Sequence, residues 1–243
     1  MQIGIIQKVN EHHEPILQCT KEVTQLYCNR HNYTYIIDTA EWDKSRNPRW
    51  IKYPALHRAM QNHPEIDWFM WLDADILIMN HDITLDSFVN TDKDFVSETF
   101  ILPKTYKIED IQGEVILTWC KGQVVPWPSI HAGCMLFRNC EWAQSFIHEL
   151  YADHKFWRPD LSGLTESDEL AITIYLMHYP GYKEHTKFVP LGSFLTTNER
   201  KYFPEGVRIY KDGDFMVHIA AYPVHTRVKI LEEYKQRFYN ATT

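Results

Sequence analysis

The chain has 243 residues, of which 44% are hydrophobic and 23% are charged, and its formal net charge at pH 7 is -7. This composition excludes an intrinsically disordered chain, and the length fits one α/β domain. A net negative charge without a dense basic run excludes a general nucleic-acid-binding protein. We therefore expect one domain that spans residues 1–243.

Hydrophobic periodicity predicts that strands and helices alternate in the first part of the chain. The expected elements are a strand at Ile3–Ile6, a helix at Pro15–His31, a strand at Tyr33–Ile37, a helix at Trp50–Asn62 and a strand at Asp67–Leu72. This alternation is typical of an α/β fold with a mostly parallel central sheet flanked by helices. Ligands of such sheets bind beyond the carboxyl ends of the strands.

The remaining part of the chain has weaker patterns. Strands are expected at Asp94–Thr99, Cys134–Phe137, Phe188–Pro190 and Phe215–His218, and helices at Glu141–His154, Glu166–His178 and Val228–Tyr239. Residues 100–130 contain several Pro and Gly residues and little periodicity. This segment is predicted to be an irregular, partly mobile insertion on the acceptor side of the domain.

The strongest chemical signal is Asp73-Ala74-Asp75, directly after the hydrophobic strand Asp67–Leu72. If that strand continued, its alternation would point both carboxylates the same way. Buried carboxylates repel each other unless a cation offsets their charge. Carboxylate oxygens suit Mg²⁺ and Mn²⁺, which also bind phosphate oxygens. The motif predicts a divalent-cation site, although a solvated turn or a helix cap would also explain an isolated Asp-x-Asp.

Three further segments contain residue types that occur in such sites. His218 ends a short apolar strand and is either a third metal ligand or a structural histidine. In His131–Asn139, small residues before a strand allow a ligand to approach the backbone, as would a plain loop-to-strand junction. Asp168 and Glu169 begin a predicted helix, where acids either cap the helix or face a site.

In this order, the four segments resemble glycosyltransferase family 34, which contains α-galactosyl-, α-mannosyl- and xyloglucan α-xylosyltransferases. The resemblance covers most of the chain and is weakest within residues 100–130. Two departures are His131, where Asn is more usual, and the acidic helix start Ser167-Asp168-Glu169. The membrane anchor and stem of the family are a third feature that this sequence does not show.

The resemblance implies a single Rossmann-like GT-A domain and a metal-dependent glycosyltransferase. Such an enzyme moves a sugar from a nucleotide-sugar donor, a UDP- or GDP-sugar, to a glycan or glycoconjugate acceptor, with retention of the anomeric configuration. The resemblance implies that the backbone at Ile6 and Gln7 contacts the nucleobase, that Asp73 binds the ribose or the metal, and that Asp75 and His218 bind Mn²⁺ (or Mg²⁺). Lys52 and Arg227 are either phosphate contacts or solvated surface cations. Asp168 is the first choice for the carboxylate at the sugar centre and Glu169 the second, and Trp119, Trp127 and Trp157 either stack on the acceptor or lie in the core.

The sequence also bears on the compartment. Its five cysteines match no zinc pattern, so free thiols in a reducing compartment are expected. No signal peptide or membrane span is recognisable. We expect a cytoplasmic or otherwise soluble protein, and a location in the Golgi lumen only if an anchor was removed. The oligomeric state stays open.

Two other functions are compatible with paired acids in this fold class. A nucleotidyltransferase would make the nucleotide sugar, but the segment Gln7–His12 lacks the glycines of a phosphate-binding loop. A non-catalytic carbohydrate-binding domain would use the acids as a structural metal site.

Overall fold

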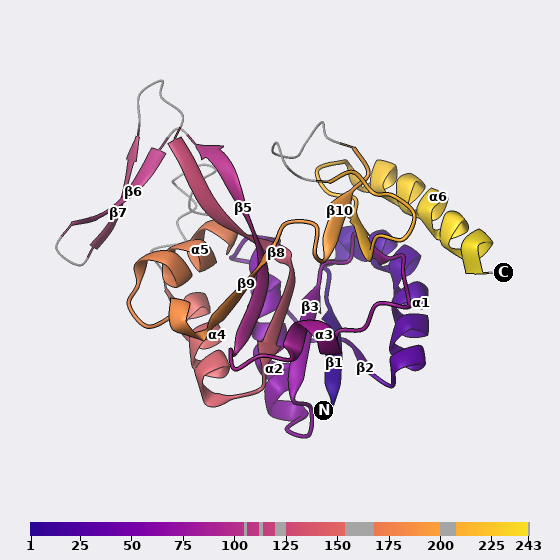
Figure 1. Cartoon of the computed structure of the whole chain (residues 1–243), viewed down its shortest axis with the longest axis horizontal. Helices are drawn as coiled ribbons and strands as arrows, with labels where there is room; N and C mark the ends of the chain where they lie inside the picture. The colour runs from indigo at the N-terminus through magenta and orange to yellow at the C-terminus, as the bar shows by residue number, and fades with distance from the viewer. Residues whose placement is uncertain (105, 112–113, 120–124, 154–167, 200–207, 243) are drawn as a thin grey trace.

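The computed structural model describes residues 1–104, 106–111, 114–119, 125–153, 168–199 and 208–242. Within them, a main sheet lies between layers of helices (Figure 1). Its strands run in the order β2, β1, β3, β8, β5, β9. Their bounds are β1 Ile3–Gln7, β2 Thr34–Ile37, β3 Trp68–Leu72, β5 Phe95–Lys104, β8 Val125–Arg138 and β9 Thr186–Pro190.

The direction of these strands makes the sheet mixed. Strand β1 is parallel to β2 and β3, and β5 is parallel to β9. Strand β8 is antiparallel to both of its neighbours, β3 and β5. The predicted α/β fold with helices around a central sheet is confirmed. The parallel part lies on the β1 side, where the alternation in the sequence is clearest.

Helices cover both faces of the main sheet. They are α1 Glu14–His31, α2 Lys52–Asn62, α3 Asp86–Val89, α4 Glu141–Ala152, α5 Asp168–His178 and α6 Val224–Thr242, with 3₁₀ turns η1 Glu11–His13, η2 Pro48–Ile51 and η4 Lys183–His185. Apolar residues of α2, α4 and α5 pack in one cluster on one face. Helices α1 and α6 pack against each other and against β4 on the other side. Within the described residues, no helix combines the length and apolarity that a membrane span needs.

Helix α1 shows how local sequence sets its bounds. Pro15 stands in the first turn, where its missing N–H costs nothing. Asn32 ends the helix in the left-handed conformation with φ 57°, and its N–H is bonded to the carbonyl of Cys28. Ile16, Val23 and Tyr27 lie on the buried face. The predicted helix at Pro15–His31 is thus confirmed to within one residue.

A second, smaller sheet has the order β10, β11, β4, with bounds Leu195–Thr197, Met216–His218 and Ile76–Ile78. The chain leaves the main sheet at the end of β3, turns through Asp73–Asp75 and enters the second sheet as β4. The strand therefore does not continue through the acidic motif. Because β11 pairs with β4 in antiparallel register, His218 lies opposite Ile76, next to Asp75.

The segment 100–130 contains regular strands, contrary to the irregular insertion predicted from sequence. Strands β5 and β8 continue into it as a long antiparallel pair. Strands β6 (Tyr106–Ile111) and β7 (Glu114–Trp119) form a two-stranded sheet that projects away from the rest of the molecule (Figure 1). The prediction was wrong because it took the prolines as a sign of irregular structure, whereas Pro103 and Pro126 face each other within the β5–β8 ladder.

A large bulge interrupts the pairing of β5 with β8. While β5 advances from Ser97 to Thr99, its partner residues run from Met135 to Ile130. The residues of β8 between these two positions leave the ladder beside Glu98. A bulge of this kind redirects a strand and re-aims its side chains. It carries His131 to Gly133 toward the end of β3.

Glu98 connects this bulge to the loop before β10. Its side chain is fully buried, and its Oε1 accepts the backbone N–H groups of Phe194 and Leu195. Burial raises the pKa of Glu98 to about 7, despite these N–H donors. The carboxyl thus positions the loop that leads into the sheet of His218.

Glu98→Gln should change how stability depends on pH. A carboxyl whose folded pKa lies above its ordinary 4.5 favours the folded state at low pH, and this contribution is lost as the pH rises through about 7. Relative to the variant, the wild type should lose up to roughly 3 kcal/mol of unfolding free energy between pH 4.5 and pH 8. Urea unfolding at both pH values measures the difference. The exposed Glu233→Gln is the control, and equal pH dependence in all three proteins would contradict the prediction.

Candidate active site

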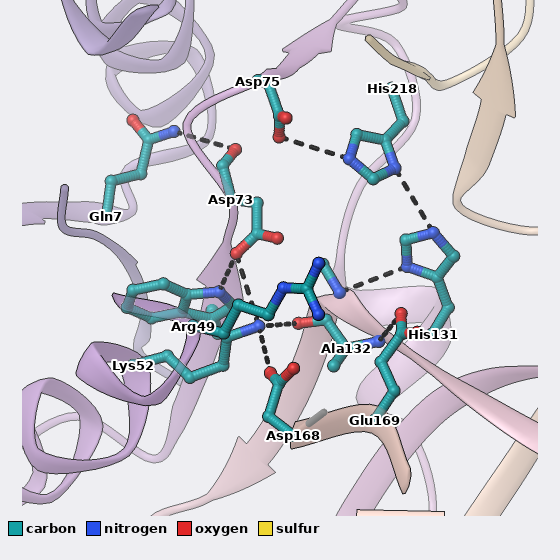
Figure 2. A network of polar contacts seen from close by, with 12 residues as sticks. Gln7, Arg49, Lys52, Asp73, Asp75, His131, Ala132, Asp168, Glu169 and His218 are labelled. Atoms are coloured by element: carbon teal, nitrogen blue, oxygen red, sulfur yellow. Dashed lines mark hydrogen bonds and ion pairs between the residues drawn. The ribbon is translucent and has the colours of Figure 1, made fainter. Parts of the chain in front are cut away.

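The acidic motif forms the turn between the two sheets, and hydrogen bonds to the backbone and the side chain of Asp73 fix it there (Figure 2). The N–H of Asp73 donates to the carbonyl of Gly133 at 2.8 Å. Its Oδ1 accepts the indole N–H of Trp71 at 2.6 Å. Burial and the nearby Asp75 raise the pKa of Asp73, whereas the Lys52 ammonium opposes the shift. The Asp73 side chain keeps 31% of its surface exposed, so it can reach a ligand.

Asp75 lies between the side chains of Arg227 and His218. Its Oδ2 accepts from Nη1 of Arg227 at 2.8 Å, and its Oδ1 lies 3.2 Å from Nε2 of His218. Although burial opposes the effect, these two neighbours lower the pKa of Asp75 to about 2. In turn, and also against burial, Asp75 raises the pKa of His218. Asp75 is therefore ionised at neutral pH.

Asp73, Asp75 and His218 can together hold a metal ion. One ligand atom from each lies within 4.8 Å of the others. Two carboxylate oxygens and one imidazole nitrogen suit Mn²⁺, and Mg²⁺ accepts the oxygens equally well. The residues that the sequence predicts as metal ligands thus meet at one point, and their donor set fits the predicted cation.

His131 is a neighbour of this cluster to which the sequence assigns no role. Its Nε2 lies 3.3 Å from Nδ1 of His218, and its Nδ1 accepts the N–H of Gly133 at 3.2 Å. Burial, with the adjacent His218 and Lys52, lowers the pKa of His131 to about 3. The ring is therefore neutral at pH 7. Its position depends on the bulge in β8, which the sequence does not reveal.

Lys52, at the start of α2, is buried between Asp73 of the acidic turn and Asp168 of α5 (Figure 2). Its Nζ lies 2.7 Å from Oδ2 of Asp168 and 3.6 Å from Oδ1 of Asp73, and it donates to the carbonyl of Ala132 at 2.9 Å. Although burial opposes the shift, the two carboxylates raise the pKa of Lys52. Lys52 thus neutralises the carboxylates of the site before any phosphate enters.

The two acids at the start of α5 lie in different surroundings. Asp168 is 3% exposed and forms the ion pair with Lys52. Glu169 is partly exposed, and its Oε1 accepts the N–H of Ala132 at 3.4 Å. Burial and the charge of Asp168 raise the pKa of Glu169. The predicted helix start at Glu166 and Ser167 lies outside the described residues.

A cavity of about 140 Å³ opens beside the acidic turn, with Asp73 and Asp75 in its lining. Its basic lining residues are Lys8, His13, Arg49, Lys52 and Arg227. Lys8 is already paired with Asp38, its Nζ being 3.3 Å from Oδ1, whereas Arg49 is exposed. In a chain with a formal net charge of -7, this local excess of basic groups favours an anionic ligand.

Arg49, Lys8 and His13 are site residues that sequence reasoning missed. Arg49 precedes Lys52 by one helical turn, and this spacing was the available signal. Ile6 and Gln7, predicted at the nucleobase, are fully buried residues of β1 and do not line the cavity. Gln7 instead supports the acidic turn, donating from Nε2 to the carbonyl of Asp73 at 3.5 Å.

The predicted acceptor tryptophans stay predictions. Trp157 lies outside the described residues, and Trp119 and Trp127 are placed only as members of β7 and β8.

Comparison with known proteins identifies the family of this site. Residues 3–227 match the galactosyl transferase GMA12/MNN10 family, which is glycosyltransferase family 34. The chain belongs to this family. The resemblance found in the four sequence segments is thereby confirmed, and with it the membership of a glycosyltransferase family.

Two curated relatives show the extent of the similarity. The chain is 33% identical over 125 residues to galactomannan galactosyltransferase 1 of Cyamopsis tetragonoloba, over 50% of this chain and 24% of that protein. It is 24% identical over 230 residues to an alpha-1,2-galactosyltransferase of Schizosaccharomyces pombe, over 85% of this chain and 56% of that protein. The chain thus spans about half or less of the length of these relatives.

Solved structures support the fold. A glycosyltransferase involved in glycosylation of the major capsid of PBCV-1 has a TM-score of 0.66 at 16% identity, covering 96% of this chain and 100% of that one. The galactosyltransferase LgtC, solved with donor and acceptor sugar analogues, has a TM-score of 0.51 at 9% identity, covering 95% of each chain. The GT-A fold predicted from the family resemblance is confirmed.

Lys52→Met should destabilise the protein, because it leaves the buried Asp168 without its cation. Removing one partner of a buried ion pair costs about 3–5 kcal/mol of unfolding free energy. Urea unfolding measures the loss, with the exposed Lys229→Met as the control. Adding Asp168→Asn to Lys52→Met should recover part of the loss. A fall below about 1 kcal/mol for Lys52→Met would contradict the ion pair described above.

Proposed function

We propose that this chain is the catalytic domain of a metal-dependent glycosyltransferase that moves a sugar from a nucleotide-sugar donor to a glycan acceptor. The observation that carries the proposal is the convergence of Asp73, Asp75 and His218 beside a cavity lined with basic residues. Metal ligands next to basic groups fit a diphosphate, which binds both. Membership of a galactosyl transferase family favours glycosyl transfer over nucleotidyl transfer or carbohydrate binding alone.

The donor is proposed to be a UDP-sugar. Its diphosphate would lie between the acidic turn and the basic groups of the cavity, among which Arg49 and Arg227 are partly or fully exposed. Its base and ribose would extend toward the end of β1, where Lys8, Val9 and Asn10 line the cavity. The galactosyltransferase names of the curated relatives support a UDP-sugar over a GDP-sugar by analogy.

A divalent cation on Asp73, Asp75 and His218, Mn²⁺ or Mg²⁺, would supply Lewis-acid stabilisation of the diphosphate as leaving group. The chain's own residues do the remaining work. Arg227 can contribute a guanidinium to the same phosphates, because it already lies 2.8 Å from Asp75. Lys52 keeps the carboxylates below the turn neutralised.

A carboxylate at the start of α5 is proposed to face the sugar centre. Asp168 was the first choice from sequence, but its ion pair with Lys52 and its 3% exposure favour a role in positioning Lys52. Glu169 is more exposed and lies against Ala132 in the bulge. We therefore assign Glu169 to the oxocarbenium-like centre, with retention of configuration. An NMR spectrum that shows a β-linked product from an α-donor would rule out retention.

The function is tested by thermal shift over a panel of nucleotide sugars with and without Mn²⁺. We expect one UDP-sugar, and UDP itself, to raise the midpoint only when metal is present, because ligand that binds the folded state stabilises it. If the protein instead made the nucleotide sugar and released pyrophosphate, it would be a nucleotidyltransferase. No response to any donor would refute the proposed donor site.

Asp75→Asn should abolish metal-dependent transfer while the protein remains folded. We expect the affinity for Mn²⁺ to fall by more than ~100-fold, since outer partners of a metal ligand already account for 10–100-fold. Electron paramagnetic resonance of free Mn²⁺ measures binding, and the thermal midpoint monitors folding. Asp82→Asn, at an exposed ion pair, is the control. Unchanged Mn²⁺ binding by Asp75→Asn would refute the metal assignment.

Glu169→Gln and Asp168→Asn separate the two acids of α5. Glu169→Gln should lower turnover by about 10²-fold or more, the size expected for a positioned catalytic group, with donor binding retained. Asp168→Asn should mainly lower the unfolding free energy, because Lys52 loses its ion-pair partner. Steady-state turnover and urea unfolding of both variants make the test. The reverse pattern would return the catalytic assignment to Asp168.

A further inference from the structure

Arg49 differs from the other basic residues that line the cavity beside the acidic turn. In the part of the chain that the structure describes, its guanidinium has no hydrogen-bond or ion-pair partner, and the residue is exposed. The other basic lining residues all have polar partners, which are Asp38 for Lys8, Asn10 for His13, Asp168 for Lys52 and Asp75 for Arg227. An anionic ligand can therefore bind Arg49 without displacing an existing contact.

The backbone of Arg49 is held in place although its guanidinium is not. Arg49 belongs to the 3₁₀ turn η2, in which Pro48 stands in the first turn and the side chain of Asn47 accepts the N–H of Arg49 at 3.1 Å. The next residue, Trp50, is 1% exposed and anchors this turn in the core. The fold thus sets the position of Arg49 at the cavity and leaves its charged end available to a ligand.

The order of the strands shows on which side of the cavity Arg49 lies. Strands β2, β1, β3 and β8 are neighbours in that order. On the β2 side, Lys8 follows β1 and contacts the segment after β2. On the β8 side, Lys52 donates to the carbonyl of Ala132 in β8. Arg49 precedes Lys52 by one helical turn, and Figure 2 shows its side chain extending to the side on which Ala132 lies.

This position corresponds to the sugar end of the proposed donor. The base and ribose are proposed to lie at the end of β1, near Lys8. The sugar centre is proposed to lie at Glu169, whose Oε1 accepts the N–H of Ala132 at 3.4 Å. In a nucleoside diphosphate sugar, the α-phosphate is joined to the ribose and the β-phosphate to the sugar. The phosphate on the side of Arg49 is therefore the β-phosphate.

We propose that Arg49 binds the β-phosphate of the nucleotide-sugar donor. A guanidinium can donate two parallel hydrogen bonds to one phosphate group. When the bond between the sugar carbon and the β-phosphate oxygen breaks, its electron pair stays on that oxygen, and a positive charge beside it stabilises the leaving diphosphate. The inference rests on the proposed function, since it takes the cavity as the donor site.

Calorimetric titration of Arg49→Gln with UDP and with UMP, both in the presence of Mn²⁺, tests this contact. UMP has no β-phosphate and is therefore the probe that lacks the proposed partner of Arg49. We expect the variant to bind UDP about 10-fold more weakly than the wild type, because charge-assisted hydrogen bonds are lost, and to bind UMP as the wild type does. Arg30→Gln is the matched control, since Arg30 is an exposed arginine that pairs with Asp82.

The outcomes separate this inference from the proposed function. If Arg49→Gln binds UDP as well as the wild type does, Arg49 is not a donor contact, and the proposed function stands. If the variant loses affinity for UDP and UMP equally, the assignment to the β-phosphate is wrong. If the wild type binds neither nucleotide with Mn²⁺, the proposed donor site is refuted and the inference falls with it. The thermal midpoint of Arg49→Gln should equal that of the wild type, because an exposed side chain without a described partner is replaced.

Discussion

The ammonium of Lys52 is the interaction on which the site depends. It joins the start of α2 to Asp168 of α5, to Asp73 of the acidic turn and to the carbonyl of Ala132 in β8. Carboxylates removed from water repel one another, and a buried cation between them makes their close approach possible. The start of α5, the acidic turn and β8 are distant in sequence but meet at the ammonium of Lys52. This contact holds the acidic turn in place.

The charge of Asp75, at the other end of the acidic turn, is compensated by different partners. Arg227 of α6 and His218 of β11 compensate Asp75, so the C-terminal part of the chain closes the site. Glu98 positions the loop that leads to the second sheet, and the bulge next to it carries His131 and Gly133 to the end of β3. The positions of the proposed metal ligands thus depend on the junction between the two sheets.

Charge compensation also links the architecture to the proposed chemistry. A site that neutralises its own acids with Lys52 and Arg227 needs little further positive charge. In the proposed function, the diphosphate of the donor would bring ligands for a cation and would compete for the guanidinium of Arg227.

The sequence alone determined the α/β class, the start and end of α1, the family, and the candidate ligands Asp73, Asp75 and His218, because hydrophobic periodicity and local motifs record these features directly. Tertiary structure decided the rest. The sequence left open whether the strand continues through the acidic motif, and it predicted irregular structure over residues 100–130. Pairing with distant strands gave a turn between two sheets and a long β5–β8 ladder. The pairing of Lys52 with Asp168 and the contact of His131 with His218 arise between residues far apart in the chain. Such contacts depend on register and on a bulge, and local sequence preferences do not encode either.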